Sequence, residues 1–345
     1  MLMTTTYRFS IFLPVRNGGH YFRKCVLSIL AQTYRNFDLI VLDNASTDGS
    51  LEWIRKLKDL RVTVYMSEKS LSIEDNWARI MLAQKNEFMT ITGHDDLFDP
   101  DYLENMCQLI ERNPDAGLYQ THFRLINAEG KRIRSCTAMP LVENIGEFVA
   151  SRLSFLRDSF GTGYMFRSAD YESVGGIPSY KKLMFADDAL WVQLMQSSYK
   201  ATSDKECFSY RVHSQSTSHS PDWESTYQAL DCYVTLLELI SQKDTGVANA
   251  LAGNMKGYFI FWYQWAYFSS LKNDEQEKLI NAIHISALHI GGILKKLGVE
   301  DADKFESDVR KHVFSCISRY YWFFNRLRRW SANNISPKLI GLHLA

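Results

Sequence analysis

Apolar and polar residues follow one another along the first two-thirds of the chain in blocks that predict alternating strands and helices. Four short apolar runs predict buried strands at residues 9–15, 37–42, 62–65 and 88–92. Between them, apolar residues at three- and four-residue spacing predict helices at residues 21–32, 51–57 and 73–84. Because short loops join these elements, we expect an α/β fold in which helices cover both faces of a mostly parallel sheet.

The pattern changes after the fourth strand. A helix is predicted at 102–111, with Pro100 in its first turn, and another at 185–194. Further strands are predicted at residues 117–120, 132–135 and 207–212, and residues 161–178 are interpreted as a loop-rich region. From residue 222 onward the pattern is helical almost throughout. We therefore predict an α/β domain at 1–220 and a helical C-terminal region at 221–345, with the boundary near Ser220.

Composition narrows the class of protein. Hydrophobic residues make up 46% of the 345 residues and charged residues 23%, which is typical of a globular chain. Six scattered cysteines form no Cys-x-x-Cys pair, which argues against a zinc site or a disulfide framework and favours a reducing compartment. Residues 1–7 lack a signal-peptide core, and the most apolar stretch, 258–268, is too short to span a bilayer. A cytoplasmic location is predicted.

Two acidic pairs carry the candidate chemistry. Asp95 and Asp96 follow the strand at 88–92, at the mouth of a strand-to-helix loop, where open α/β sheets bind ligands. Carboxylates there suit a hard divalent cation and sugar hydroxyls, although a solvated loop that caps a helix would look similar. Asp187 and Asp188 lie in the first turn of a predicted helix. Carboxylates at this position also stabilise a helix by interacting with its dipole, so a purely structural role is the alternative.

Five motifs, in order, resemble family 2 glycosyltransferases of the GT-A fold over roughly residues 9–218. They are Pro14-Val15-Arg16-Asn17, the turn from Leu42 to Asp48, Asn76 with His94-Asp95-Asp96, Ala186-Asp187-Asp188, and Tyr210-Arg211-Val212-His213 with Ser218. One departure is Gly93, where members often carry another Asp. The resemblance implies a Rossmann-like sheet flanked by helices and an inverting transfer from a nucleotide sugar.

The resemblance also implies roles for individual residues. It implies a UDP- or dTDP-sugar donor in a pocket whose wall is formed by Pro14, Val15 and Asn17. Asp43 would accept a hydrogen bond from the pyrimidine N3–H, and Asn76 would also contact the donor. Asp95 would lie at the ribose or the metal. Asp96 is the leading ligand for Mn²⁺ or Mg²⁺, and His213 is the second. Asp188 is the predicted general base, and Asp187 beside it would raise its proton affinity.

The C-terminal third has an aromatic helix at 258–268 and a last helix around 313–327 that carries several arginines. From Val309 to the end there are seven Lys or Arg residues and no Asp or Glu. This region either packs on the sheet or docks on an anionic membrane surface, near a lipid-linked acceptor on its inner face. No nucleic-acid recognition module accompanies the basic residues. We expect the acceptor to be a saccharide or lipid-linked glycan, as in surface polysaccharide synthesis.

Three other classes of protein were weighed. A sugar-nucleotide pyrophosphorylase needs a glycine-rich phosphate loop after the first strand, which Gly18 and Gly19 alone do not supply. A dehydrogenase needs Gly-x-Gly-x-x-Gly, which the sequence lacks. A non-catalytic nucleotide-sugar-binding or scaffold protein on the same fold is the remaining alternative. Retention of Asp43, Asp96 and Asp188 together argues against such a loss of activity.

Overall fold

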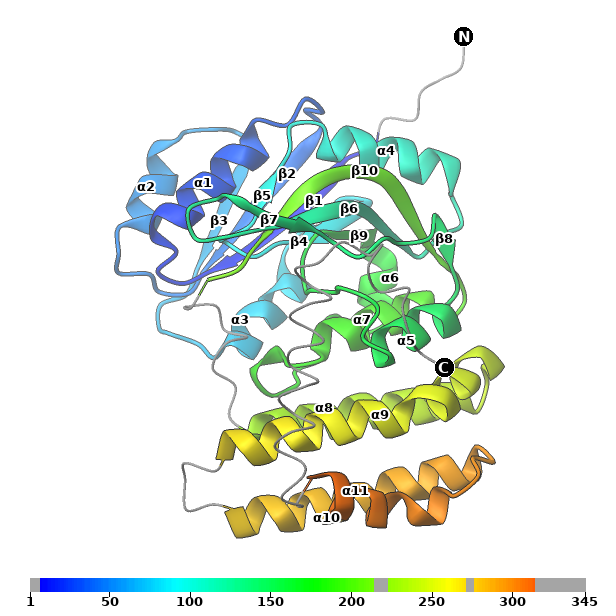
Figure 1. The fold of residues 1–345 in the computed structure, drawn as a ribbon. Helices are drawn as coiled ribbons and strands as arrows, with labels where there is room; N and C mark the ends of the chain where they lie inside the picture. The colour runs from blue at the N-terminus through cyan, green and yellow to red at the C-terminus, as the bar shows by residue number, and fades with distance from the viewer. Residues whose placement is uncertain (1–6, 214–222, 271–275, 314–345) are drawn as a thin grey trace.

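A ten-stranded sheet forms the centre of the described structure (Figure 1). The computed structural model describes residues 7–213, 223–270 and 276–313. The strands are β1 (Phe9–Val15), β2 (Phe37–Asp43), β3 (Val62–Met66), β4 (Phe88–Ile91), β5 (Leu97–Phe98), β6 (Leu118–Ile126), β7 (Arg132–Ser135), β8 (Val142–Glu143), β9 (Tyr164–Arg167) and β10 (Lys200–Arg211). Their order is β3-β2-β1-β4-β9-β6-β10-β5, with β7 paired to β6 and β8 paired to β10.

Most of this sheet is parallel, as predicted. Strands β1 to β4 run together, and β6 and β10 run in the same direction as they do. Strand β9 lies between β4 and β6 and is antiparallel to both, while β5, β7 and β8 are antiparallel additions. The carboxyl ends of the six parallel strands therefore meet at one edge of the sheet, where the predicted site residues follow β1, β2, β4 and β10.

Helices cover both faces of the sheet (Figure 1). One face packs on α1 (Gly19–Leu30), α2 (Ser50–Lys56) and α4 (Tyr102–Arg112). The other carries α3 (Ile73–Ala78), α5 (Ile145–Leu153), α6 (Ser168–Ser173) and α7 (Ala186–Met195). Alternation along β1 explains the two layers, because Ile11 and Leu13 belong to the apolar cluster with α1 and α4, whereas Phe12 belongs to the cluster with α5 and α7.

The C-terminal helices extend the second face. They are α8 (Trp223–Ser241), α9 (Thr245–Ser270), α10 (Gln276–Lys296) and α11 (Phe305–Val313). Helices α8 and α9 lie beneath α5 and α7, and α10 and α11 lie beneath them (Figure 1). One apolar cluster runs through all these layers, from Leu190 in α7 through Tyr233 in α8 and Phe259 in α9 to Ile283 in α10. The helical pattern predicted after residue 222 is thus confirmed for the described part of the chain.

Some predictions fall outside the described residues. These are the domain boundary near Ser220, Ser218, and nearly all of the basic last helix predicted after Val313. The division into domains at 1–220 and 221–345 therefore stays a prediction. Within the described ranges, no helix is long and apolar enough to cross a membrane.

Several element boundaries differ from the prediction for local reasons. Helix α2 starts at Ser50, one residue earlier than predicted, and its N-cap is Gly49, whose φ of 83° suits glycine. The helix predicted at 73–84 is α3 followed by a 3₁₀ turn at Arg79–Leu82. Pro100 precedes the N-cap of α4 instead of lying in its first turn. Strands β6 and β10 are much longer than predicted.

Two elements lie inside the region that was predicted to be loop-rich, and one helix was missed before it. Strand β9 and helix α6 occupy residues 164–173. Helix α5 begins with a capping box, in which the Asn144 side chain accepts from the Glu147 N–H and the Glu147 carboxylate accepts from the Asn144 N–H. This Asn-x-x-Glu spacing was a readable signal for the start of α5.

Candidate functional site

The turns after β1 and β2 are tied to each other by hydrogen bonds. The Asn17 backbone N–H donates to Ser46 Oγ at 3.0 Å, and Asn17 Oδ1 accepts from the Thr47 N–H at 2.8 Å. Asp48 accepts from the Gly19 N–H at 2.8 Å. Asn17 therefore connects the turn after β1, beside Pro14 and Val15, to the turn after β2. Its side-chain oxygen Oδ1 accepts the hydrogen bond from the Thr47 N–H in this connection.

Asp43 ends β2 in a buried position and is braced from behind. Its carboxylate accepts from the Ser46 N–H at 3.3 Å. Arg79 Nη1 donates to the Asp43 carbonyl at 2.9 Å and to Asn76 Oδ1 at 2.8 Å, while Asn76 Nδ2 donates to the Leu42 carbonyl. Burial lowers the pKa of Arg79 and the charge of Asp43 opposes that change. Sequence reasoning missed Arg79, although it lies one helical turn after Asn76.

In the acidic turn after β4, Asp95 and Asp96 have different surroundings. Asp96 is 1% exposed and accepts from the Arg211 backbone N–H at 3.0 Å. Burial raises the pKa of Asp96 well above its usual value, the charge of Asp95 raises it further, and the nearby Thr162 hydroxyl opposes both. Asp95 Oδ2 lies 2.8 Å from His213 Nε2. His213 therefore contacts Asp95, whereas the Asp96 side chain accepts from the Arg211 N–H, and the assignment of Asp96 as a metal ligand stays a prediction.

The Asp95–His213 pair fits a divalent cation. Asp95 and His213 hydrogen-bond to each other at 2.8 Å and together offer a carboxylate oxygen and an imidazole nitrogen, a donor set that suits Mn²⁺. Among the described residues, no group of three or more His, Cys, Asp or Glu side chains could hold a metal ion. Two protein ligands are nevertheless enough for Mg²⁺-type sites, in which substrate phosphates and waters fill the other positions.

The second acidic pair, at the start of α7, also divides into two roles. Asp188 is 2% exposed and forms a two-point ion pair, with Arg152 Nε at 2.7 Å from Oδ1 and Nη2 at 2.5 Å from Oδ2. Asp187 is only partly buried. Burial and then the charge of Asp188 raise the pKa of Asp187 to about 7. The predicted base Asp188 is thus held by an arginine that sequence reasoning missed, while Asp187 has the properties expected of a base.

A short loop joins the two acidic pairs. A Cβ at Gly161 would lie 3.5 Å from Asp187 Cβ, and Thr162 lies beside Asp96. Phe160, just before them, stacks on Tyr210 with ring centroids 3.6 Å apart. The loop at residues 160–163 therefore links the start of α7, through Asp187, to the acidic turn after β4, through Asp96.

Comparisons with known proteins show which family and fold the chain resembles. Residues 10–170 match the family model described as "Glycosyl transferase family 2". The glycosyltransferase GlyG of Streptococcus pneumoniae is 32% identical over 104 residues, which are 30% of this chain and 35% of the relative. Glycosyltransferase GlyA of the same organism is 29% identical over 110 residues, 30% of this chain and 15% of the relative. The matches thus span about a third or less of these relatives.

Solved structures match a larger share of the chain. The crystal structure of S. aureus TarS residues 1–349 in complex with UDP-GlcNAc covers 88% of this chain, which in turn covers 90% of that structure. The TM-score is 0.68 and the sequence identity is 16%, so this likeness shows the fold alone. It extends beyond residue 170 into the C-terminal helices and confirms the predicted GT-A fold with a helical C-terminal part. Residues 10–170, just under half of the chain, are thus similar to glycosyl transferase family 2.

Proposed function

We propose that the protein transfers a sugar from a UDP- or dTDP-sugar to a hydroxyl of a saccharide or lipid-linked glycan, with inversion at the anomeric carbon. One observation carries this proposal. Gly161 and Thr162 are adjacent in the chain and lie beside Asp187 and Asp96, and Asp96 directly follows Asp95, which contacts His213. This proximity supports a site in which Asp95 and His213 would hold a cation and Asp187 would accept a proton.

In the proposed reaction, Asp187 accepts the proton of the acceptor hydroxyl. The acceptor oxygen forms a bond to the anomeric carbon as the bond from that carbon to the diphosphate oxygen breaks, and the nucleoside diphosphate leaves. Mn²⁺ or Mg²⁺ held by Asp95 and His213 would neutralise the charge that develops on the diphosphate. Asp43, braced by Asn76 and Arg79, would accept a hydrogen bond from the pyrimidine N3–H.

Like-charge repulsion and burial suit Asp187 to the base role at neutral pH. A carboxyl with a pKa near 7 is half ionised there and takes up a proton more readily than an ordinary aspartate does. Asp188 would instead orient the start of α7 through its ion pair with Arg152. This exchanges the roles that the sequence alone suggests for the two residues. The proposal that the acceptor is linked to a lipid is based on the basic residues of the C-terminal sequence.

Nucleotide binding tests the proposal without an acceptor. Thermal unfolding of the purified protein is measured with UDP, dTDP, GDP and CMP, with and without Mn²⁺. A ligand at a hundred times its dissociation constant adds about 2.7 kcal/mol to the free energy of unfolding. We expect UDP or dTDP to stabilise the protein in a Mn²⁺-dependent manner. Stabilisation by GDP alone would contradict the role of Asp43. No shift with any nucleotide would favour the scaffold alternative.

A further inference from the structure

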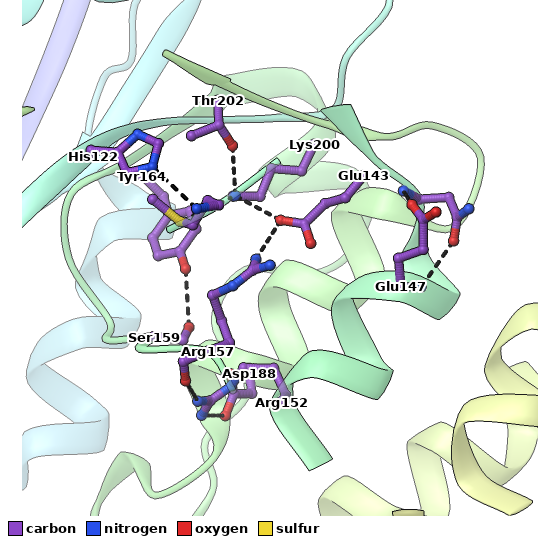
Figure 2. Close-up of polar contacts among 12 residues, drawn as sticks. His122, Glu143, Glu147, Arg152, Arg157, Ser159, Tyr164, Asp188, Lys200 and Thr202 are labelled. Carbon is purple, nitrogen blue, oxygen red and sulfur yellow. Dashed lines mark hydrogen bonds and ion pairs between the residues drawn. The ribbon is translucent and has the colours of Figure 1, made fainter. Parts of the chain in front are cut away.

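Five charged residues are connected by hydrogen bonds and ion pairs next to the sheet (Figure 2). Asp188 is paired with Arg152, whose Nη1 donates to the Arg157 carbonyl at 2.9 Å. Arg157 Nη1 lies 2.5 Å from Glu143 Oε1, and Lys200 Nζ donates to the same oxygen at 2.8 Å. The start of α7 is thus connected through the segment after α5 to the beginning of β10.

These buried charges are not expected to contribute much to the free energy of unfolding. The side chains of Arg157, Glu143 and Lys200 are 4%, 1% and 0% exposed. Three cations face two carboxylates in the whole chain of five, and within the described structure Glu143 Oε2 and Arg157 Nε have no hydrogen-bond partner. Well-packed apolar residues in place of such groups are often neutral or stabilising, because buried charges lose their hydration.

The charges do fix a segment that reaches the site. Arg157 begins the stretch that continues to Gly161, beside Asp187, and Thr162, beside Asp96. At the far end, Ser159 Oγ lies 3.0 Å from the Tyr164 hydroxyl (Figure 2). Arg157 pairs with Glu143 of β8, which also binds Lys200 of β10, and the Arg157 carbonyl accepts from Arg152, which pairs with Asp188 of α7. The buried charges therefore connect the segment to both the sheet and α7.

We propose that Arg157, Glu143 and Lys200 are positioning residues for glycosyl transfer. They hold residues 157–163 between Asp187 and the acidic turn, and they set the rate of transfer without contributing to nucleotide binding. This inference rests on the proposed function, since it assumes that Asp187 and the acidic turn act on one substrate.

The test replaces the three charges by an apolar residue of similar length, in the triple variant Glu143→Met/Arg157→Met/Lys200→Met. A matched control, Lys295→Met/Asp303→Met, removes an exposed ion pair of the C-terminal helices. For each protein we would measure unfolding in urea, hydrogen exchange of the 157–163 amides, the dissociation constant of UDP with Mn²⁺, and the rate of UDP release from UDP-GlcNAc with water as acceptor.

We expect the triple variant to be as stable as the wild type or more so, and to bind UDP within about threefold of it. Hydrogen exchange at 157–163 should be at least tenfold faster, and the rate of UDP release at least tenfold lower, while the control matches the wild type. A stable triple variant with unchanged exchange or unchanged UDP release would overturn the proposal.

Two further outcomes are separable. If the triple variant does not fold, Arg157→Lys takes its place, since it keeps the charge but loses the planar fork. It should bind UDP normally and release UDP more slowly, and a normal rate would overturn the proposal. If the wild type binds no UDP or dTDP, the proposed function fails first and the kinetic role fails with it, whatever the exchange experiment shows.

Discussion

The two carboxylates of each acidic pair have different surroundings because they contact different side chains. Asp187 and Asp188 are identical in type and neighbours in the chain, yet only Asp188 meets Arg152. Both acidic pairs were predicted from the sequence, as was their position at strand and helix ends. The different roles of the two carboxylates were not predicted. The partner of Asp188 is Arg152, which is 36 residues away in a helix that was missed.

Asp187→Asn and Asp188→Asn should therefore fail in different ways. We expect Asp187→Asn to fold normally and bind UDP, and to lower the rate of transfer by about 10²–10⁴-fold, the usual contribution of a general base. Asp188→Asn leaves Arg152 without its charge partner, which should lower the free energy of unfolding by roughly 3 kcal/mol. Urea unfolding and the rate of UDP release distinguish the two.

The pH dependence of the rate gives a second reading of Asp187. The base acts in its ionised form, so the wild-type rate should rise with pH, reach half its maximum near pH 7 and level off above it. Arg152→Met leaves the charge of Asp188 unopposed and should move the midpoint to higher pH. A wild-type rate that is flat from pH 5 to 8 would contradict the assignment of the base to Asp187.

Asp95 and Asp96 are distinguished by their dependence on metal. Asp95→Ala removes the side chain that faces His213, so UDP should no longer stabilise the protein more in the presence of Mn²⁺. Asp96→Asn keeps an acceptor for the Arg211 N–H and should retain the Mn²⁺ dependence. The opposite result in a thermal unfolding assay would restore Asp96, the residue favoured by sequence alone.

At the scale of elements, the approach of α5 to α9 depends on a glycine at position 146. A Cβ at Gly146 would lie 2.6 Å from the Gly246 carbonyl carbon and 2.7 Å from its Cα, both of which are backbone atoms that cannot move aside easily. Elements with regular periodicity, such as β1, β2 and α1, were predicted within two residues. Helix α5 was missed although its capping box at Asn144 and Glu147 is a local signal, whereas its pairing with α9, about a hundred residues further along, could not be predicted from a local pattern.

We expect Gly146→Ala to lower the free energy of unfolding by about 1–3 kcal/mol through overpacking between the two helices. Gly253→Ala, in the exposed part of α9, is the control, since its Cβ would meet nothing within 4 Å. It should raise the free energy of unfolding by roughly 0.5–1 kcal/mol through helix propensity. Equal effects of the two substitutions in urea unfolding would show that the glycine contact does not limit packing.

At the scale of the whole molecule, stability should depend on pH through Lys200. Burial lowers the pKa of Lys200 from 10.5 to about 8, although Glu143 opposes that change. Between these values the unfolded chain binds the proton and the folded protein does not, so the free energy of unfolding rises with pH. Relative to Lys200→Met, the wild type should gain about 2 kcal/mol between pH 7 and 9.5. Lys295→Met, at an exposed site, should follow the wild type, and parallel curves for wild type and Lys200→Met would contradict the burial effect.

The apolar cluster that runs from the sheet through α5 and α7 into α8, α9 and α10 also limits how this chain can exchange parts with its relatives. A crossover near residue 221 would join a resident α5 to a foreign α9, whose backbone would have to fit against Gly146 as closely as the Gly246 backbone does. Hybrids that inherit α5 and α9 from the same parent avoid this conflict. The segment that must be exchanged as a whole with the helical region therefore begins near residue 144, well before the point at which the sequence becomes helical.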